Sequence, residues 1–293
     1  MIAILGGLGA AVAWAISTLC SSRSSRILDP IVVVGWVMLV GLVVALPPAL
    51  AVGVPSRLWG GDGAWLLLAG ATNVGGLIVT YEALKVGQVA LVAPIVSSEG
   101  ALAAVIAVLA GETIAAGSGV ALAVIAVGIW LASTPAPAEA PALAEAPARA
   151  AQPARPRAEG LALAVCAAAI FGASLYATGR ASADLPSAWI ALAPRLVGLP
   201  VIVLPLAALG RLRLVRPAAP LVVASGICEV VGFYSYAGGS RHGIAIAAVL
   251  SSQFGAIAAV AGYALFGERL TRMQVAGVVT LLVGVAALSA LSA

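Results

Sequence analysis

Long apolar stretches alternate with short polar ones along almost the whole chain. Ten of these stretches are about twenty residues long, which is enough to cross the hydrocarbon core of a bilayer as helices. We place them at residues 2–21, 31–51, 63–84, 89–110, 114–132, 160–181, 187–209, 218–238, 244–266 and 271–291. The pattern therefore predicts an all-α integral membrane protein with ten transmembrane helices.

One polar segment, residues 133–159, divides the apolar pattern into two parts of similar length. Its sequence is STPAPAEAPALAEAPARAAQPARPRAE, and the repeated prolines block a continuous helix and favour an extended, solvated backbone. We interpret this segment as a linker between a first unit, residues 1–132, and a second unit, residues 160–293.

The two units also resemble each other. An offset of 155 residues pairs Tyr81 with Tyr236, Ser97 with Ser252 and Gly100 with Gly255. An offset of 157 residues pairs Leu39-Val40-Gly41-Leu42 with Leu196-Val197-Gly198-Leu199, and Ser17 with Ser174. Because each unit has five spans, an odd number, the second unit must enter the membrane in the opposite orientation. The sequence thus predicts two inverted five-helix repeats, with a substrate site near the midplane between them.

Composition excludes several other classes of protein. The chain is 62% hydrophobic and 9% charged, whereas a soluble domain carries about a quarter charged residues. Its net charge of +4 comes from arginines scattered over loops, which is not typical of a nucleic-acid-binding patch. The three cysteines lie in apolar stretches, which argues against a disulfide framework. The first stretch lacks a basic leader and a small-residue cleavage site, so we expect a retained span.

Charged residues at mid-depth are the main candidates for function, because an ionised side chain in hydrocarbon is costly. Glu99 lies about 15 Å into its span, Arg195 about 12 Å and Glu229 about 16 Å. Arg195 and Glu229 come from consecutive antiparallel spans. They form either a structural ion pair or part of a cavity that meets a charged substrate group. Glu99 is either a protonated carboxyl hydrogen-bonded to a neighbouring helix or a site that binds a proton or a cationic group.

The remaining candidates are uncharged. They are the polar pairs Ser97-Ser98 and Ser252-Gln253, which correspond in the two units, together with Asn73, Trp14, Tyr176 and Tyr234. Each aromatic residue either lines the cavity or packs, and Asn73 either lines it or bonds a neighbouring helix. His242 is the only histidine, and we expect it to be solvated in a short loop. Metal-ligand spacings, phosphate-binding loops and Ser/His/Asp sets are absent from the sequence, so we expect no metal, no cofactor and no enzyme activity.

Several short motifs resemble the EamA-type transporters of the drug/metabolite transporter superfamily. They are Tyr81-Glu82-Ala83-Leu84, Ser97-Ser98-Glu99-Gly100, Gly111-Glu112, Pro194-Arg195-Leu196 and Gly267-Glu268-Arg269-Leu270. The family commonly has proline after the position of Glu99, where this chain has Gly100. The resemblance implies a secondary carrier that moves small metabolites or drugs by alternating access, and an exporter rather than an importer.

Orientation in the membrane is predicted differently by two arguments. Eleven of the 15 basic residues lie in the loops after spans one, three, five, seven and nine, which by the positive-inside rule puts both termini outside the cytoplasm. The family resemblance implies that both termini lie inside. The sequence leaves the two arguments in conflict.

Together these patterns predict a multi-pass carrier in the cytoplasmic membrane of a prokaryote, driven by the proton gradient. Its partners would be a small polar or amphipathic substrate, protons and the lipid bilayer, with no nucleic acid, and it would act as a monomer or homodimer. Two alternatives stay open. One is an exchanger or facilitator without proton coupling, and the other is a membrane scaffold that transports nothing.

Overall fold

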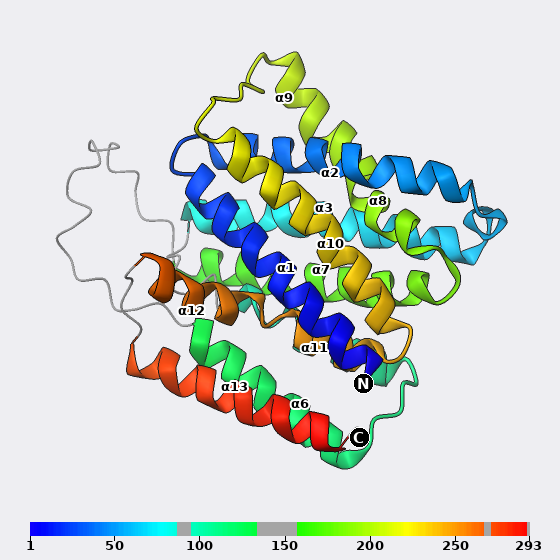
Figure 1. Cartoon of the computed structure of the whole chain (residues 1–293), viewed down its shortest axis with the longest axis vertical. Coiled ribbons are helices and arrows are strands. Elements are labelled where there is room, and N and C mark those ends of the chain that lie inside the picture. The colour runs from blue at the N-terminus through cyan, green and yellow to red at the C-terminus, as the bar shows by residue number, and fades with distance from the viewer. Residues whose placement is uncertain (87–94, 134–156, 267–270, 292–293) are drawn as a thin grey trace.

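The chain folds into a bundle of helices, shown as a computed structural model in Figure 1. The structure describes residues 1–86, 95–133, 157–266 and 271–291. Over these residues the chain forms helices and turns and no strand. Most of the predicted linker and the Gly267-Glu268-Arg269-Leu270 motif lie outside the described residues. The described ends of the linker, Ser133 and residues 157–159, are helical and continue the helices on either side.

The first unit contains α1 (Ile2–Ser24), α2 (Pro30–Val52), the 3-10 turn η1 (Ser56–Trp59), α3 (Gly61–Val86), α5 (Glu99–Leu109) and α6 (Ala116–Ser133). The second contains α7 (Arg157–Asp184), α8 (Ser187–Gly198), the π-helical η2 (Leu199–Val203), α9 (Leu204–Ala208), α10 (Ala219–Ser240), α11 (Ile244–Ser251), α12 (Phe254–Phe266) and α13 (Arg272–Leu291).

Helix length and composition confirm a multi-pass membrane protein. Six described segments are long and apolar enough to cross a bilayer: Ile2–Ser24, Pro30–Val52, Gly61–Thr80, Glu159–Asp184, Ser187–Ala208 and Ala219–Ser240. Shorter apolar helices occupy Glu99–Leu109, Ala116–Leu131, Ile244–Ala258 and Val275–Val285. Large apolar side chains such as Leu5, Val43 and Leu282 lie exposed on the surface of the bundle, as expected where the surrounding solvent is lipid.

Three of the predicted spans are not single α-helices. In the span 89–110, residues 95 and 96 are helical, Ser97 and Ser98 form a turn, and α5 begins at Glu99. In the span 244–266, α11 ends at Ser251 and α12 begins at Phe254. The span 187–209 passes through η2, where Pro200 lacks the N–H that a regular helical bond needs. The hydropathy pattern predicted continuous helices because the residues at these breaks lie within long apolar stretches.

The interior of the bundle is the contact between the two units. Helix α1 packs against α10, α3 against α7, and α5 against α7 and α11. Figure 1 shows α6 and α13 side by side at the edge of the bundle, where they pack on each other. Each of these contacts therefore joins a helix of the first unit to a helix of the second.

Close contacts between helices occur at matched positions in the two units. A Cβ atom on Gly128 of α6 would lie 2.6 Å from the backbone nitrogen of Leu281. A Cβ atom on Gly284 of α13 would lie 2.7 Å from Cγ1 of Ile125. Gly284 follows Gly128 by 156 residues, and Leu281 follows Ile125 by the same number. The α6–α13 contact therefore uses corresponding positions of the two helices.

A second pair of contacts repeats in the same way. The ring of Phe171 on α7 lies against Gly76 of α3, 2.8 Å from where a Cβ atom would stand. The ring of Trp14 on α1 lies against Gly232 of α10, 2.2 Å from where its Cβ atom would stand. The aromatic residues are 157 positions apart and the glycines 156. The α3–α7 and α1–α10 contacts thus use corresponding residues.

Candidate functional site

The two helix breaks lie against each other inside the bundle. A Cβ atom on Gly100 would lie 2.1 Å from Oγ of Ser252 and 2.3 Å from the carbonyl oxygen of Ala248. On the other side of α5, a Cβ atom on Gly172 of α7 would lie 3.1 Å from the carbonyl oxygen of Glu99. A proline ring at position 100 would meet the same atoms as a Cβ, so this packing explains why glycine stands there.

Polar side chains gather at the two breaks. Ser97, Glu99, Ser252 and Gln253 are all buried. The hydroxyl of Ser98 donates to the carbonyl oxygen of Ile95 at 2.6 Å, and that of Ser252 donates to Ala248 at 3.1 Å. Both carbonyl oxygens also accept the backbone N–H of the same serine, so each hydroxyl adds a second hydrogen bond within its turn. The structure therefore places Ser252 of one predicted polar pair against Gly100, which follows Glu99.

Glu99 occupies the first turn of α5 and is 8% exposed. Its carboxyl makes no hydrogen bond or ion pair with another residue in the part of the chain that the structure describes, although the charge of Glu229 is within electrostatic range. The positive end of the α5 dipole favours a negative charge at this position. Glu99 is thus a buried carboxyl at a helix end, with no cation of the described residues paired to it.

Arg195 and Glu229 meet, as their depths in the sequence predicted. An η nitrogen of Arg195 lies 3.5 Å from the Glu229 carboxylate, whose other oxygen accepts a hydrogen bond from Ser17 at 3.1 Å. The Arg195 guanidinium also lies 4.8 Å from the ring centre of Phe233. The remaining Arg195 nitrogens, Nε and one η nitrogen, are buried and bond no described residue. This cation is therefore only partly satisfied by its surroundings.

The positions of the first unit that correspond to Arg195 and Glu229 carry no charge. Arg195 packs against Gly41 of α2, whose Cβ atom would lie 2.8 Å from Nε. In the corresponding contact, Met38 packs against Gly198, with Sδ 3.0 Å from the Cβ position. Arg195 follows Met38 by 157 residues, and Glu229 follows Asn73 by 156. The ion pair is therefore a feature of the second unit alone.

The predicted aromatic candidates lie in two different places. Trp14 packs edge-on against Phe233 with ring centres 5.5 Å apart, and Tyr234 packs on the same core cluster. Tyr176 lies elsewhere, edge-on to Trp65 with ring centres 5.8 Å apart. Asn73 is half-buried on α3. Tyr234 lies on α10, the helix that carries Glu229, and Trp14 packs on that helix through Phe233.

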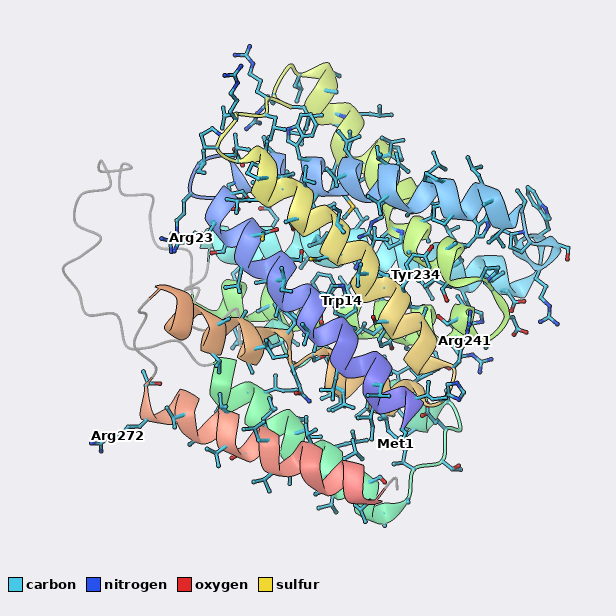
Figure 2. All side chains as sticks on the ribbon, viewed as in Figure 1. Met1, Trp14, Arg23, Tyr234, Arg241 and Arg272 are labelled. Atoms are coloured by element: carbon cyan, nitrogen blue, oxygen red, sulfur yellow. The ribbon has the colours of Figure 1, made fainter. Side chains whose placement is uncertain are left out.

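A cavity of about 540 Å³ opens at one end of the bundle. Tyr176, Gly179 and Arg180 of α7 line one side, and the end of α10 with the following loop, including Arg241 and His242, lines another. Figure 2 shows Arg241 towards the same end as Met1, with Arg23 and Arg272 towards the opposite end. The sequence indicated a site role for Tyr176 but not for Arg180, Arg241 or His242, because residues of α7 and of the loop after α10 meet only in the folded chain.

Comparison with known families gives the class of the protein. The profile of the EamA-like transporter family matches residues 1–134 and 158–290. The chain belongs to the EamA-like transporter family. Members of this family are membrane transporters rather than enzymes. Within the described part of this EamA-like protein, no three His, Cys, Asp or Glu side chains are placed to hold a metal ion.

This EamA-like protein was also compared with curated proteins and with solved structures. A search of curated proteins gave no match. One crystal structure aligns with a TM-score of 0.75 and 20% sequence identity, covering 99% of this chain and 96% of the other. At that identity the alignment establishes a shared fold and says nothing of the substrate.

Proposed function

We propose that this EamA-like protein is a secondary carrier that moves a small metabolite by alternating access between two inverted five-helix repeats. The crossing of two broken helices at Gly100 and Ser252 is the observation that carries this proposal. In carriers built from inverted repeats, discontinuous helices meet near the midplane, and their half-helix ends bind substrate or coupling ions. The polar pairs at both breaks and the buried Glu99 fit that arrangement.

The reciprocal contacts support the inverted arrangement. Two units related by a two-fold axis contact each other through the same residues on both sides. Gly128 and Gly284 have this relationship, and so do the contacts that Trp14 and Phe171 make with glycines. The sequence offsets of 156 and 157 residues match those of the repeated motifs. With five spans in each unit, the axis would lie in the plane of the membrane.

Glu99 is our candidate for the coupling site. A carboxylate inside the membrane with no counter-ion is costly, so a proton or a cationic substrate group would stabilise it. Binding and release of that partner at the helix crossing would link the state of Glu99 to the relative position of the two repeats. We propose proton-coupled export, with the direction resting on the family alone.

The Glu99→Gln variant tests this proposal. Purified protein in liposomes would be screened with a panel of radiolabelled metabolites under a pH gradient, with and without an uncoupler. We expect Glu99→Gln to lose at least about ten-fold of the gradient-driven flux, which corresponds to about 1.4 kcal/mol, while eluting as folded protein. The control is Glu159→Gln, which removes an exposed carboxyl near the start of α7. Full gradient-driven transport by Glu99→Gln would contradict a role for Glu99 in coupling.

The same experiment separates the two alternatives. Flux that is saturable but insensitive to the uncoupler would indicate an exchanger or facilitator. A scaffold would transport no member of the panel. In a scaffold, a cysteine at position 97 or 252 would also fail to react with water-soluble thiol reagents added from either side.

A further inference from the structure

We propose that the 540 Å³ cavity is a binding site for a small organic anion that carries a carboxylate. The inference deepens the proposed function, since a carrier with such a site would receive an anionic substrate there. The binding itself is argued from the charges, the walls and the depth of the cavity, and it can be tested without transport.

Two guanidinium groups line the cavity, and neither pairs with a carboxylate of the described residues. Arg180 is exposed, and its guanidinium lies 6.0 Å from the ring centre of Trp65, with no hydrogen bond or ion pair to a described residue. Arg241 donates from Nε to the carbonyl oxygen of Ser182 at 2.5 Å and from an η nitrogen to that of Leu185 at 2.9 Å. Carbonyl oxygens orient a guanidinium and leave its full positive charge in place. Arg241 is therefore a fixed cation at the cavity wall.

The acidic group in the described lining is already engaged. Both carboxylate oxygens of Glu112 accept from the backbone N–H of Ala245, at 3.2 and 3.3 Å. Ala245 lies in the first turn of α11, where the helix dipole favours a negative charge. His242 adds a further nitrogen donor beside the two arginines. The cavity therefore carries an excess of positive charge, which concentrates anions in a recess of low dielectric.

The walls suit an anion with a small apolar body. The lining also includes apolar surface from Tyr176 of α7, Ala107 and Ala110 of α5, and Ile244 of α11. The volume falls within the range of about 300–1,000 Å³ found for small-molecule sites. A carboxylate could take a bidentate hydrogen bond from the guanidinium of Arg180 while the rest of the ligand contacts the Tyr176 ring.

The cavity lies on the helices that form the crossing. Tyr176, Arg180 and Ala183 share one face of α7 with Gly172, which touches the Glu99 backbone deeper in the bundle. On α5, Ala107 is about 12 Å along the helix from Glu99. A ligand in the cavity would therefore contact the same two helices that position Glu99.

Equilibrium binding to the full chain tests the inference. The protein in phosphatidylcholine nanodiscs would be titrated with benzoate, with the neutral analogue benzamide and with inorganic phosphate, using calorimetry. We expect saturable benzoate binding, with Kd raised about ten-fold or more in Arg180→Gln, because a charge-assisted bidentate hydrogen bond is lost. His242→Ala should also weaken binding. The matched control is Arg216→Gln, which removes an exposed arginine at the opposite end of α10 and should leave Kd unchanged.

Several results would overturn the inference. These are the absence of saturable benzoate binding, equal affinity for benzoate and benzamide, phosphate binding without benzoate binding, and unchanged Kd in Arg180→Gln. Loss of benzoate binding in nanodiscs of phosphatidylglycerol would assign the cavity to a lipid headgroup instead. A protein that binds benzoate but transports nothing would contradict the proposed function alone, whereas a transporter with no benzoate site would contradict this inference alone.

Discussion

Arg195 shows how one substitution between repeats creates a charged site. It stands where the first unit has Met38, in a contact that is otherwise conserved between Gly41 and Gly198. Its partner Glu229 stands where the first unit has Asn73. Both the pair and its neutral counterpart fit the same packing between helices. The charges are therefore not needed to make this helix contact, which favours a role in binding over a purely structural one.

Replacing Arg195 and Glu229 by the residues at the corresponding positions of the first unit tests this interpretation. Glu229→Asn alone leaves Arg195 buried without its counter-ion, and we expect a loss of up to about 3 kcal/mol in stability. The double variant Arg195→Met/Glu229→Asn should recover most of that loss, because it restores the neutral composition of Met38 and Asn73. Thermal and denaturant unfolding of the purified protein would measure both changes. A double variant that is no more stable than Glu229→Asn would show that the ion pair does not act as a unit.

At the scale of elements, the broken helices α5 and α11–α12 determine where polar groups can lie in the interior. Each break exposes backbone carbonyl and N–H groups that a continuous helix would bond internally. The hydroxyls of Ser98 and Ser252 bond to carbonyl oxygens of their own turns, while Nε2 of Gln253 is buried and bonds no described residue. Gly100 lets the breaks approach closely enough to form one polar region. The crossing therefore depends on the absence of a single methyl group.

Gly100→Ala should disrupt this crossing. The added Cβ atom would lie 2.3 Å from the backbone oxygen of Ala248, so α5 and α11 would have to separate. We expect a loss of about 1–3 kcal/mol in stability, as for overpacked cores, together with reduced transport. Gly119→Ala in α6 is the matched control, because nothing lies within 4 Å of its Cβ position, and it should be neutral or slightly stabilising. Equal stability of the two variants would contradict close contact at Gly100.

At the scale of the whole molecule, exposed ion pairs between described residues join the two units at both ends of the bundle. Arg57, after α2, pairs with Asp184 at the end of α7. Arg211, after α9, pairs with Asp29 before α2 at 3.2 Å. Both pairs are exposed, and such pairs contribute only about 0–1 kcal/mol each. If the units rock about the crossing, these pairs therefore add little to the free energy needed to open either end.

Covalent links at these two ends test alternating access. In a background without Cys20, Cys166 and Cys228, cysteines would replace either Arg57 and Asp184 or Asp29 and Arg211. Cross-linking either pair should stop transport in liposomes, and a reductant should restore it, because each end must open once per cycle. The control replaces Arg57 and Asp62, which lie 3.7 Å apart within the first unit, and this cross-link should leave transport intact. Continued transport after complete cross-linking between the units would contradict the rocking motion.

Local properties of the chain were sufficient to predict that it is helical and that it lies in a membrane. Whether a stretch of Ala, Gly, Val and Leu becomes a membrane helix depends on its own length and polarity, so the multi-pass α-helical class followed from hydropathy. The meeting of Arg195 and Glu229 was also predictable, because consecutive antiparallel spans bring residues of equal depth together. The repeated motifs in turn indicated that Ser97-Ser98 and Ser252-Gln253 occupy equivalent positions.

Contacts between distant segments were decided only by the tertiary structure. The helix breaks arise where α5 and α11 pack through Gly100, and hydropathy does not register a backbone interruption inside an apolar stretch. The cavity likewise requires the end of α7 to meet the loop after α10, so Arg180, Arg241 and His242 had no shared signal in the sequence. Apolar length is a property of each segment by itself, whereas a cavity and a helix crossing exist only between segments.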